Sequence, residues 1–566
     1  MLDGYNTLIT VAALGAILAY SFHVVLMAGQ LSLGQAGFAS LAAYTSTLVV
    51  PTEPIAGSIS PVVVGLPVGA LVGAAAAFVV GLPVLRLRGV FLAIATIAFG
   101  EMVRVVINNA EWTNGALGMR VEKWVTFDFA WMVVAVLAYL FWRLGPSRSG
   151  RAFAAVREDE LAAGSMGVDV VRTRMASFIA SGAIAGVYGV MFAYFFGRIT
   201  PATFDFGLTV SGLVTAVLGG YLVFFGPILG SGFLTAVPEL QNALGLEAGW
   251  IHPFVTGVFL LLVVLFLPGG LSTLFSRLRR APMRPGPDYA PLDALDPLPD
   301  PGTPIAKVRG LAKRYGAVDA VRGVDLEIRS GEVLGVIGPN GAGKTTLVNM
   351  LNGLEPPTAG EGQILGVPLG SRPHRFAQAG VSRTFQHSKL FERLTVLDNV
   401  LVGTHVVSRS TYLRRLLWLP SARRDERRAL ALAWAQLERV GLADRAGLRP
   451  GALSYGDRRR LEIARALAAH PTLLILDEPA AGMNHVEAAE LASLIRGLAD
   501  DGVTVLFIEH NVKMVLEACT RLVVLDFGEV IAEGEPREVA SDPRVVEAYL
   551  GTEAAQNDER EEIEHA

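Results

Sequence analysis

The sequence predicts a multi-domain protein, with an N-terminal all-α domain that crosses a membrane about nine times and a C-terminal α/β domain of the P-loop type. Two observations lead to this prediction. The 566-residue chain is 52% hydrophobic and only 18% charged, and nearly all of the hydrophobic excess lies before Pro282. In the second half, where charged residues are frequent, a glycine-rich loop follows a short apolar stretch.

The overall charge and the cysteine content narrow the possible functions. A formal net charge of -4 gives no global basic field, so we expect no nucleic acid partner. The only cysteine, Cys519, cannot form a disulfide within the chain, which agrees with a cytosolic second half. The first residues, Met1 to Asn6, lack the positive charge of a secretory signal peptide. We therefore interpret the apolar run that follows them as a first membrane helix.

Nine apolar runs before Pro282 are candidates for membrane-spanning helices, because a crossing of about 30 Å of hydrocarbon needs roughly 20 mostly apolar residues. They lie at residues 7–28, 34–50, 61–82, 89–108, 129–144, 175–197, 207–224, 225–243 and 251–268. The seventh and eighth runs are separated at Phe225-Gly226-Pro227, where a re-entrant hairpin is the alternative. The sequence is therefore compatible with about eight to ten spans.

Positive charges give these spans an orientation. We place the Arg-rich loop 145–174 and the second half of the chain in the cytosol, which requires an even number of spans between them and puts the N-terminus outside. Residues 1–280 contain a single lysine, Lys123. The following arginines then all lie on the cytosolic side, as the positive-inside rule requires: Arg86, Arg88, Arg143, Arg148, Arg151, Arg157, Arg172, Arg174, Arg277, Arg279 and Arg280.

A few polar residues lie inside predicted spans. Glu101 and Arg104 are three residues apart on one helix face, where a charge in lipid is costly unless it is partnered or faces water. Two interpretations stay open, a structural ion pair near the outer end of the helix or part of a polar path through the membrane. His23, Gln30 and Gln35 leave the same two interpretations.

A proline-rich segment separates the two halves. Residues 281–304 contain eight prolines among Asp, Gly and Ala, a composition that neither builds a core nor continues a helix. We therefore divide the chain into a membrane domain (residues 1–280), a linker (281–304), a P-loop domain (305–551) and an acidic tail (552–566). We expect the tail to be solvated and disordered.

The P-loop has the local context that such a loop requires. The apolar stretch Val333–Ile337 runs into Gly-Pro-Asn-Gly-Ala-Gly-Lys-Thr-Thr and then into a helical pattern. In such a loop the backbone N–H groups surround phosphates, the lysine contacts the β- and γ-phosphate oxygens, and the first threonine ligates Mg²⁺. We therefore expect ATP and Mg²⁺ at Gly338, Asn340, Gly341, Gly343, Lys344, Thr345 and Thr346.

Two acidic residues follow a second apolar stretch. Leu473-Leu-Ile-Leu runs into Asp477, Glu478 and a proline, which is the Walker B arrangement. There the first carboxylate holds Mg²⁺ and the second is placed to activate water. Alone, such a pair is often only the end of a strand, but together with a P-loop it predicts ATP hydrolysis. Asp477 is then a metal ligand and Glu478 the catalytic base.

Another motif gives the second half a resemblance to the ATPases of the ATP-binding cassette (ABC) family. The run from Leu453 to Asp457, Leu-Ser-Tyr-Gly-Asp, is similar to the signature sequence of that family, although Asp457 stands where glutamine is usual. The resemblance covers about residues 305–551. It implies that Ser454 and Gly456 bind the γ-phosphate of an ATP held by an opposing subunit, so that two sites need two ATPase domains.

The same resemblance assigns three further residues. It implies that Gln386, in Ser-Arg-Thr-Phe-Gln, reaches Mg²⁺ and water, and that His510, in Phe-Ile-Glu-His, is the switch histidine near the γ-phosphate. It also implies that Tyr315 stacks on adenine. Taken singly, each residue could have an ordinary structural role, but their shared order favours the family.

The first half resembles the permeases of branched-chain amino acid (Liv-type) importers. The resemblance covers most of residues 25–275 and rests on Leu31–Phe38, on Arg86–Leu92 and on the Arg-Glu-Asp-Glu stretch that ends at Glu160. The run from Arg151 to Gly167 forms helix readily and ends in glycine, as expected of a short helix that lies on another protein surface. Ala162, Ala163 and Gly167 match the Ala-Ala-x-x-x-Gly pattern of a coupling helix.

These resemblances imply an ATP-driven half-importer of the cytoplasmic membrane, a permease fused to its ATPase, for branched-chain amino acids or related small solutes. They imply a second permease subunit, a second ABC ATPase subunit and an extracytoplasmic solute-binding protein as partners, with a homodimer as an alternative assembly. The alternative functions are an importer for urea or short amides, and a membrane-anchored ABC ATPase that does mechanical work without moving a solute. Short cytosolic loops before residue 145 disfavour an exporter.

Overall fold

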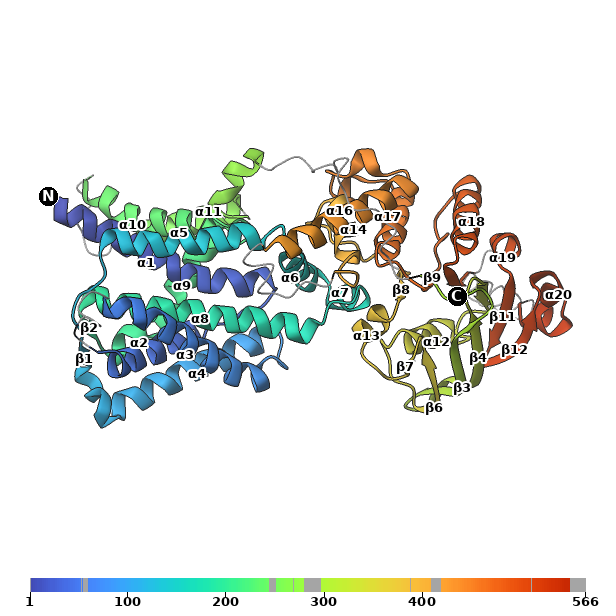
Figure 1. Ribbon diagram of the computed structural model, residues 1–566, viewed down its shortest axis with the longest axis horizontal. Helices are drawn as coiled ribbons and strands as arrows, with labels where there is room; N and C mark the ends of the chain where they lie inside the picture. Colours follow the sequence, from blue (N-terminus) through green and yellow to red (C-terminus); the bar gives the residue numbers. More distant parts are fainter. Residues whose placement is uncertain are drawn as a thin grey trace, which may run out of the picture. The chain divides into compact units, whose positions relative to one another are not determined.

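The computed structural model describes residues 2–51, 53, 60–243, 251–267, 269–278, 297–386, 388–408, 419–509 and 512–549. These residues form two compact units, drawn in Figure 1. The helical unit holds the described residues up to Arg157 and those from Val170 to residue 278. The α/β unit holds the loop Glu158–Asp169 and the described residues from 297 onward.

Each predicted span coincides with a helix of the helical unit. The helices are α1 (Leu2–Met27), α2 (Gln35–Val49), α3 (Pro61–Val84), α4 (Val90–Asn109), α5 (Phe127–Leu144), α6 (Arg148–Glu158), α8 (Val170–Phe196), α9 (Phe206–Gly219), α10 (Gly226–Ala243) and α11 (Ile251–Phe266). Five of them, α1, α3, α4, α5 and α8, are long and apolar enough to cross a membrane. Helix α9 is apolar but has only 14 residues. The predicted all-α domain with several apolar helices is thus confirmed, whereas the number of nine spans stays a prediction.

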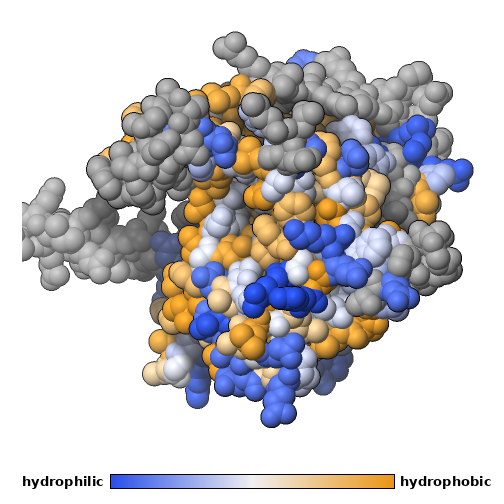
Figure 2. Space-filling model, turned by 90° about the vertical axis from the view of Figure 1, so that its left-hand side faces the viewer, coloured by the Kyte–Doolittle hydropathy of each residue, from blue (hydrophilic) through white to orange (hydrophobic). Residues whose placement is uncertain are grey.

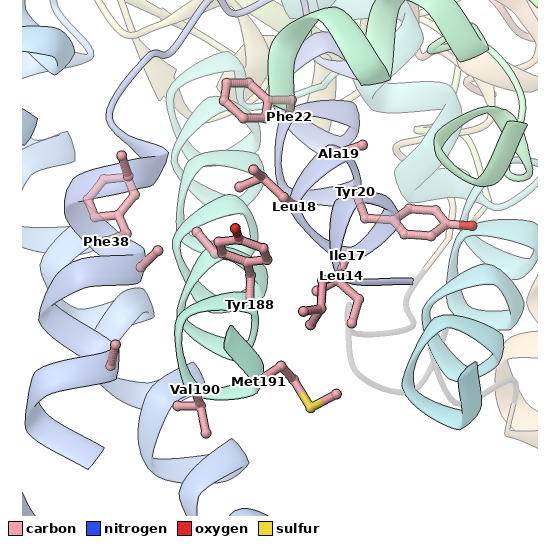
Figure 3. Close-up of a cluster of buried hydrophobic side chains, with 14 of the residues drawn as sticks. Leu14, Ile17, Leu18, Ala19, Tyr20, Phe22, Phe38, Tyr188, Val190 and Met191 are labelled. Atoms are coloured by element: carbon pink, nitrogen blue, oxygen red, sulfur yellow. The ribbon is translucent and has the colours of Figure 1, made fainter. Parts of the chain in front are cut away.

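Helix α8 is the centre of the helical unit and packs against α1, α2 and α3. Figure 3 shows the core between them, with Tyr20 and Phe22 from α1, Phe38 from α2 and Tyr188 from α8. All four side chains are buried. Because α8 has partners on several sides, it is apolar around most of its circumference, as expected of a helix inside a bundle.

Small residues let α3 and α8 approach closely. Glycine recurs every four residues on α3 at Gly65, Gly69 and Gly73, so these positions share one face. A Cβ added to Gly73 would lie 2.0 Å from the carbonyl oxygen of Gly182 on α8, and one added to Gly186 would lie 2.0 Å from that of Gly69. This is the small-residue packing that holds helices together in membranes, where the hydrophobic effect cannot.

The sides of the helical unit expose hydrophobic side chains, whereas one of its ends also exposes polar ones. Large side chains of α4 are exposed to the outside, among them Val90 at 67%, Phe91 at 71% and Val106 at 58%. Figure 2 looks at the end that carries the short strands β1 (Met119–Arg120) and β2 (Arg198–Ile199), where hydrophilic side chains gather among hydrophobic ones. Contiguous exposed apolar surface of this kind is expected where a protein contacts lipid.

A six-stranded sheet forms the centre of the α/β unit. Its strands are β5 (Val333–Ile337), β8 (Val381–Arg383), β9 (Leu473–Asp477), β10 (Thr504–Ile508), β11 (Arg521–Asp526) and β12 (Glu529–Gly534). Their order is β12-β11-β5-β10-β9-β8, and all neighbours are parallel except β11 and β12. Every residue of β5, β9 and β10 is buried, which explains why these strands read as continuous apolar runs in the sequence.

The other elements pack around this sheet. A four-stranded antiparallel sheet contains β3 (Pro304–Tyr315), β4 (Val318–Arg329), β6 (Ala359–Ile364) and β7 (Val367–Pro368) in the order β4-β3-β6-β7. The helices are α7 (Glu160–Ser165), α12 (Lys344–Leu351), α13 (Pro373–Gln378), α14 (Val396–Gly403), α16 (Pro420–Arg439), α17 (Tyr455–Leu467), α18 (His485–Asp500), α19 (Val512–Ala518) and α20 (Pro536–Ala540). Helices α14, α16 and α17 pack on one another around a separate core, and we call them the helical part.

The end of the predicted linker is attached to the α/β unit. The Ser330 hydroxyl donates to the carbonyl oxygen of Pro299 (2.9 Å), and Gly302 N–H donates to that of Ser330 (2.8 Å). Leu298 packs against the core beneath α18. Residues 281–296 of the linker and the acidic tail 552–566 lie outside the described residues.

Candidate active site

The P-loop joins β5 to α12, as the sequence predicts. Gly338 and Gly343 have positive φ angles of 152° and 94°, and a Cβ on either would lie within 2.2 Å of a carbonyl oxygen. Glycine is therefore required at both positions. Asn340, Gly341 and Thr345 are exposed, and Thr346 is half-buried. The first N–H groups of α12 have no partner within the helix, so the loop presents backbone donors to an anion.

Lys344 folds back over the loop. Its Nζ donates to the carbonyl oxygens of Gly338 (2.7 Å) and Pro339 (2.9 Å). Burial lowers the pKa of Lys344, although the carboxylates of Glu478 and Asp477 act in the opposite direction. The ammonium group therefore lies within electrostatic reach of both Walker B acids.

Asp477 ends β9 and is only 1% exposed. Its Oδ2 accepts a hydrogen bond from Arg383 Nη2 (2.8 Å), whereas its buried Oδ1 has no hydrogen-bond partner among the residues that the structure describes. An unpartnered buried carboxylate oxygen is costly, and hard cations such as Mg²⁺ prefer such ligands. The residues present therefore fit a magnesium ion held on the Oδ1 side of Asp477, as the sequence predicts.

Glu478 lies next in the chain, in an unusual backbone conformation. Its φ of 47° is rare for a residue other than glycine, and its N–H donates to the carbonyl oxygen of Ile508 at the end of β10 (3.0 Å). The Oε2 of Glu478 accepts a hydrogen bond from Gln386 Nε2 (2.9 Å). This hydrogen bond brings two predicted site residues into contact, because the side-chain amide of Gln386 donates to the carboxylate of Glu478. Ligation of metal by Gln386 stays a prediction.

The sheet brings these segments to one edge. β10 lies between β5 and β9, and because the three strands are parallel, their carboxyl ends meet. The P-loop follows β5, Asp477 ends β9, and Glu478 is the next residue. His510 follows β10 by two residues and lies outside the described residues. The intervening Glu509 is 2% exposed and accepts a hydrogen bond from Ala480 N–H (2.7 Å), which ties the end of β10 to the segment after Glu478.

Tyr315 is the last residue of β3, and its side chain is accessible. It is 45% exposed, and the ammonium group of Lys313 lies 5.2 Å from the centroid of its ring. An accessible aromatic ring can stack on a nucleotide base. The role of Tyr315 in binding adenine remains a prediction.

The signature residues lie in the helical part. Ser454 is the N-cap of α17, where its Oγ accepts from Asp457 N–H (3.2 Å) and donates to Asp457 Oδ2 (2.6 Å). Asp457 also pairs with Arg445. Burial opposes ionisation of Asp457, but Ser454 and Arg445 outweigh it and hold the pKa below its usual range. A Cβ on Gly456 would lie 3.1 Å from Glu487 Oε1, so a larger residue there requires this carboxylate to shift.

The loop predicted as a coupling helix belongs to the α/β unit. The expected helical run breaks at Asp159, whose φ of -152° ends α6, and a separate helix α7 begins at Glu160. The break occurs because Asp159 caps α7, accepting from Ala162 N–H at Oδ1 (2.7 Å). Gly167, with a φ of 81°, follows the end of α7, and α7 packs against α13.

Two contributing residues were missed by the sequence analysis. Arg383 is 3% exposed and its Nη1 also donates to Asn349 Oδ1 on α12 (2.7 Å), so it connects the P-loop helix to Walker B. Lys389 links the loop Glu158–Asp169 to α17. Arg383 could have been found from its place in the short buried strand β8, because an arginine buried in a strand needs a partner. For Lys389 the sequence offers no comparable signal.

Comparisons with known families match both halves of the chain. The ABC transporter family matches residues 321–481. The family of branched-chain amino acid transport system permease components matches residues 4–264. The family of branched-chain amino acid ATP-binding cassette transporters matches residues 529–555.

Known relatives match the second half. The high-affinity branched-chain amino acid transport ATP-binding protein BraF of Pseudomonas aeruginosa is 43% identical over 250 residues, which are 44% of this chain and 98% of that protein. LivG of Escherichia coli, with the same description, has the same identity and the same coverage of both chains. The lipopolysaccharide export system ATP-binding protein LptB of Haemophilus influenzae is 36% identical over 44% of this chain and 97% of that protein.

Proposed function

Because this chain belongs to the branched-chain amino acid family of ABC transporters, we propose that it imports branched-chain amino acids or related small solutes, driven by its own ATPase. One observation carries the proposal. The loop Glu158–Asp169 belongs to the same α/β unit as the P-loop, Asp477 and Glu478. In the sequence this loop connects helices α6 and α8 of the helical unit. Events at the nucleotide can therefore act on a segment joined directly to membrane helices.

Binding of ATP uses the loop after β5. The N–H groups of Gly341, Gly343 and the first turn of α12 bind phosphate oxygens, and Lys344 leaves its carbonyl partners to contact the β- and γ-phosphates. Tyr315 stacks on the base. Asp477 and Thr345 would hold a magnesium ion, which would offset the negative charge of the phosphates when bound.

Hydrolysis uses the residues after β9. Glu478 accepts a proton from the attacking water, and Gln386, already bonded to that carboxylate, holds the water in place. His510 contacts the γ-phosphate, and Lys344 stabilises the negative charge that develops there. Ser454 and Gly456 lie at the N-terminus of α17, where free backbone N–H groups favour an anion, and the family resemblance assigns them to an ATP held by an opposing ATPase domain.

The complete importer needs further subunits. We propose a second permease subunit, a second ABC ATPase subunit and an extracytoplasmic solute-binding protein, with a homodimer of this chain as the alternative to the first two. The helical unit spans the cytoplasmic membrane, and the α/β unit lies in the cytosol. The ATPase relatives include one named for lipopolysaccharide export, so the solute is decided by the permease and the binding protein rather than by the ATPase.

Uptake into vesicles tests the solute. The chain, its companion subunits and the solute-binding protein are reconstituted with ATP, and labelled leucine, isoleucine and valine are compared with urea and a short amide. The proposal predicts ATP-dependent accumulation of the three amino acids. Accumulation of urea or the amide alone would change the substrate class, and ATP hydrolysis without accumulation of any solute would favour a membrane-anchored ATPase that works on another protein.

Replacement of the proposed base tests the chemistry. Glu478→Gln removes the proton acceptor but keeps a side chain that can bond to Gln386, so we expect ATP binding to be retained and turnover to fall by at least about a hundredfold. Phosphate release and binding of a fluorescent ATP analogue measure the two effects. Steady-state hydrolysis at the wild-type rate would show that another group activates the water.

A further inference from the structure

We propose that Lys389 is the positioning residue through which the loop Glu158–Asp169 and the signature helix α17 move together. The proposal rests on the proposed function, because it assigns a transmission step to that transport cycle. Lys389 lies three residues after Gln386, in the segment that follows β8. Its side chain contacts the loop, and its backbone is held by α17.

The side chain of Lys389 holds the start of α7. Its Nζ donates to Asp159 Oδ2 (2.7 Å), and both side chains are 28% exposed. The other oxygen of Asp159 caps α7 through Ala162 N–H. Burial would raise the pKa of Asp159, but hydrogen bonds from Lys389 and from the first turn of α7 leave it below its usual range. The carboxylate is therefore charged and joins Lys389 to the first turn of α7.

The backbone of Lys389 is fixed to α17 at both polar atoms. Its N–H donates to Glu462 Oε1 (3.0 Å), and its carbonyl oxygen accepts from Arg465 Nη1 (2.8 Å). Arg459 supports the pair, because its Nη1 donates to Glu462 Oε2 (2.8 Å) and to the carbonyl oxygen of Phe385 (2.6 Å). Arg459, Glu462 and Arg465 are 1–3% exposed. Charged groups buried this deeply, with several hydrogen bonds, hold their neighbours in one arrangement.

Helix α17 carries this connection to the signature. Ser454 caps the helix, and Glu462 lies eight residues further along, or about 12 Å at 1.5 Å per residue. A helix of this length moves as one body. A displacement of α7 therefore pulls on Lys389, and Lys389 moves α17 together with Ser454.

A second contact of the same loop provides a control. Asp169 Oδ2 lies 3.7 Å from His374 Nε2 on α13, so this contact anchors the far end of the loop to a different helix. If the loop only needs to be held in place, loss of either contact has the same effect. If Lys389 transmits motion to α17, loss of the Lys389 contact has the larger effect.

Transport and hydrolysis are measured in the same vesicles, with the full chain and all companion subunits. Lys389→Met keeps the length of the side chain, and Asp159→Asn keeps the oxygen that caps α7. We expect each to lower the solute moved per ATP about fivefold at a near-normal rate of hydrolysis. The double variant should show the same loss as either single variant, Lys389→Arg should keep coupling, and His374→Gln should change it less than about twofold.

Two results would overturn the proposal. One is that Lys389→Met moves as much solute per ATP as the wild-type protein. The other is that hydrolysis in Lys389→Met falls as much as transport does. If the wild-type protein moves none of the amino acids, the proposed solute is wrong, and hydrogen exchange still tests the inference. In a Glu478→Gln background, ATP should alter exchange in both residues 158–169 and residues 455–467. Lys389→Met should abolish the change in 158–169 alone, and persistence of that change would refute the role of Lys389.

Discussion

Replacing Arg383 by methionine tests how the Walker B carboxylate is held. Arg383 and Asp477 are 3% and 1% exposed, and 2.8 Å separates Arg383 Nη2 from Asp477 Oδ2. Methionine keeps much of the apolar volume but removes the charge. Within the described part of the chain, the carboxylate of Asp477 would then be buried without a partner, because its Oδ1 has no hydrogen bond there. Breaking a buried ion pair from one side costs about 3–5 kcal/mol.

This cost can be measured as a thermal shift. The α/β unit contains roughly 250 residues, and for a domain of that size 1 kcal/mol corresponds to about 2–4 °C in Tm. We therefore expect Arg383→Met to lower the ATP-sensitive unfolding transition of the full chain, measured in EDTA, by about 6–20 °C. Adding Asp477→Asn should recover most of this loss, because the amide carries no charge. Arg314→Met, which breaks an exposed pair with Asp319, should leave the transition unchanged.

Either of two results would contradict this expectation. A transition within about 2 °C of the wild-type value would mean that water or another group already compensates the charge of Asp477. A double variant no more stable than Arg383→Met would mean that the loss comes from packing or from Asn349, which also bonds to Arg383.

Three further predictions concern other parts of the chain. Gly73→Val should prevent α3 from packing on α8, because even a Cβ would lie 2.0 Å from a carbonyl oxygen, and the protein should aggregate on gel filtration in detergent. Gly232→Ala meets nothing within 4 Å and should elute like the wild type. Tyr315→Ala should raise the KM for ATP about fivefold or more at unchanged kcat, and an unchanged KM would exclude stacking. Asp457→Asn keeps a hydrogen bond to Ser454 but loses the ion pair with Arg445, so the rate of hydrolysis should change less than about threefold. Loss of hydrolysis in this variant would indicate that Asp457 contacts ATP directly.

Local patterns predicted the nucleotide-binding core well. The apolar stretch Val333–Ile337 is β5, and the stretch that ends at Asp477 is β9. These strands are buried on both faces, so their sequences are apolar throughout and their ends are marked by the loops that follow. The P-loop is equally recognisable, because a turn with positive φ angles and a phosphate-binding backbone needs glycine at fixed positions.

Contacts between distant segments could not be predicted in this way. Arg383 and Asp477 are 94 residues apart and meet only because β8 lies beside β9 in the sheet. The break at Asp159 was also missed, since the run around it has high helix propensity and only the cap of α7 interrupts it. Helix α9, with 14 residues, leaves the number of spans open, because length and hydropathy alone do not fix how a short helix sits in a bilayer.

We propose that hydrolysis of ATP, with Glu478 as the base, drives a solute through the helical unit. This coupling is tested by recording phosphate release and labelled leucine uptake simultaneously, in vesicles that hold the full chain with its companion subunits and binding protein. We expect both signals to rise with ATP and both to vanish in Glu478→Gln. Rapid phosphate release that depends on Glu478 but is accompanied by no accumulation of leucine or any related solute would contradict it.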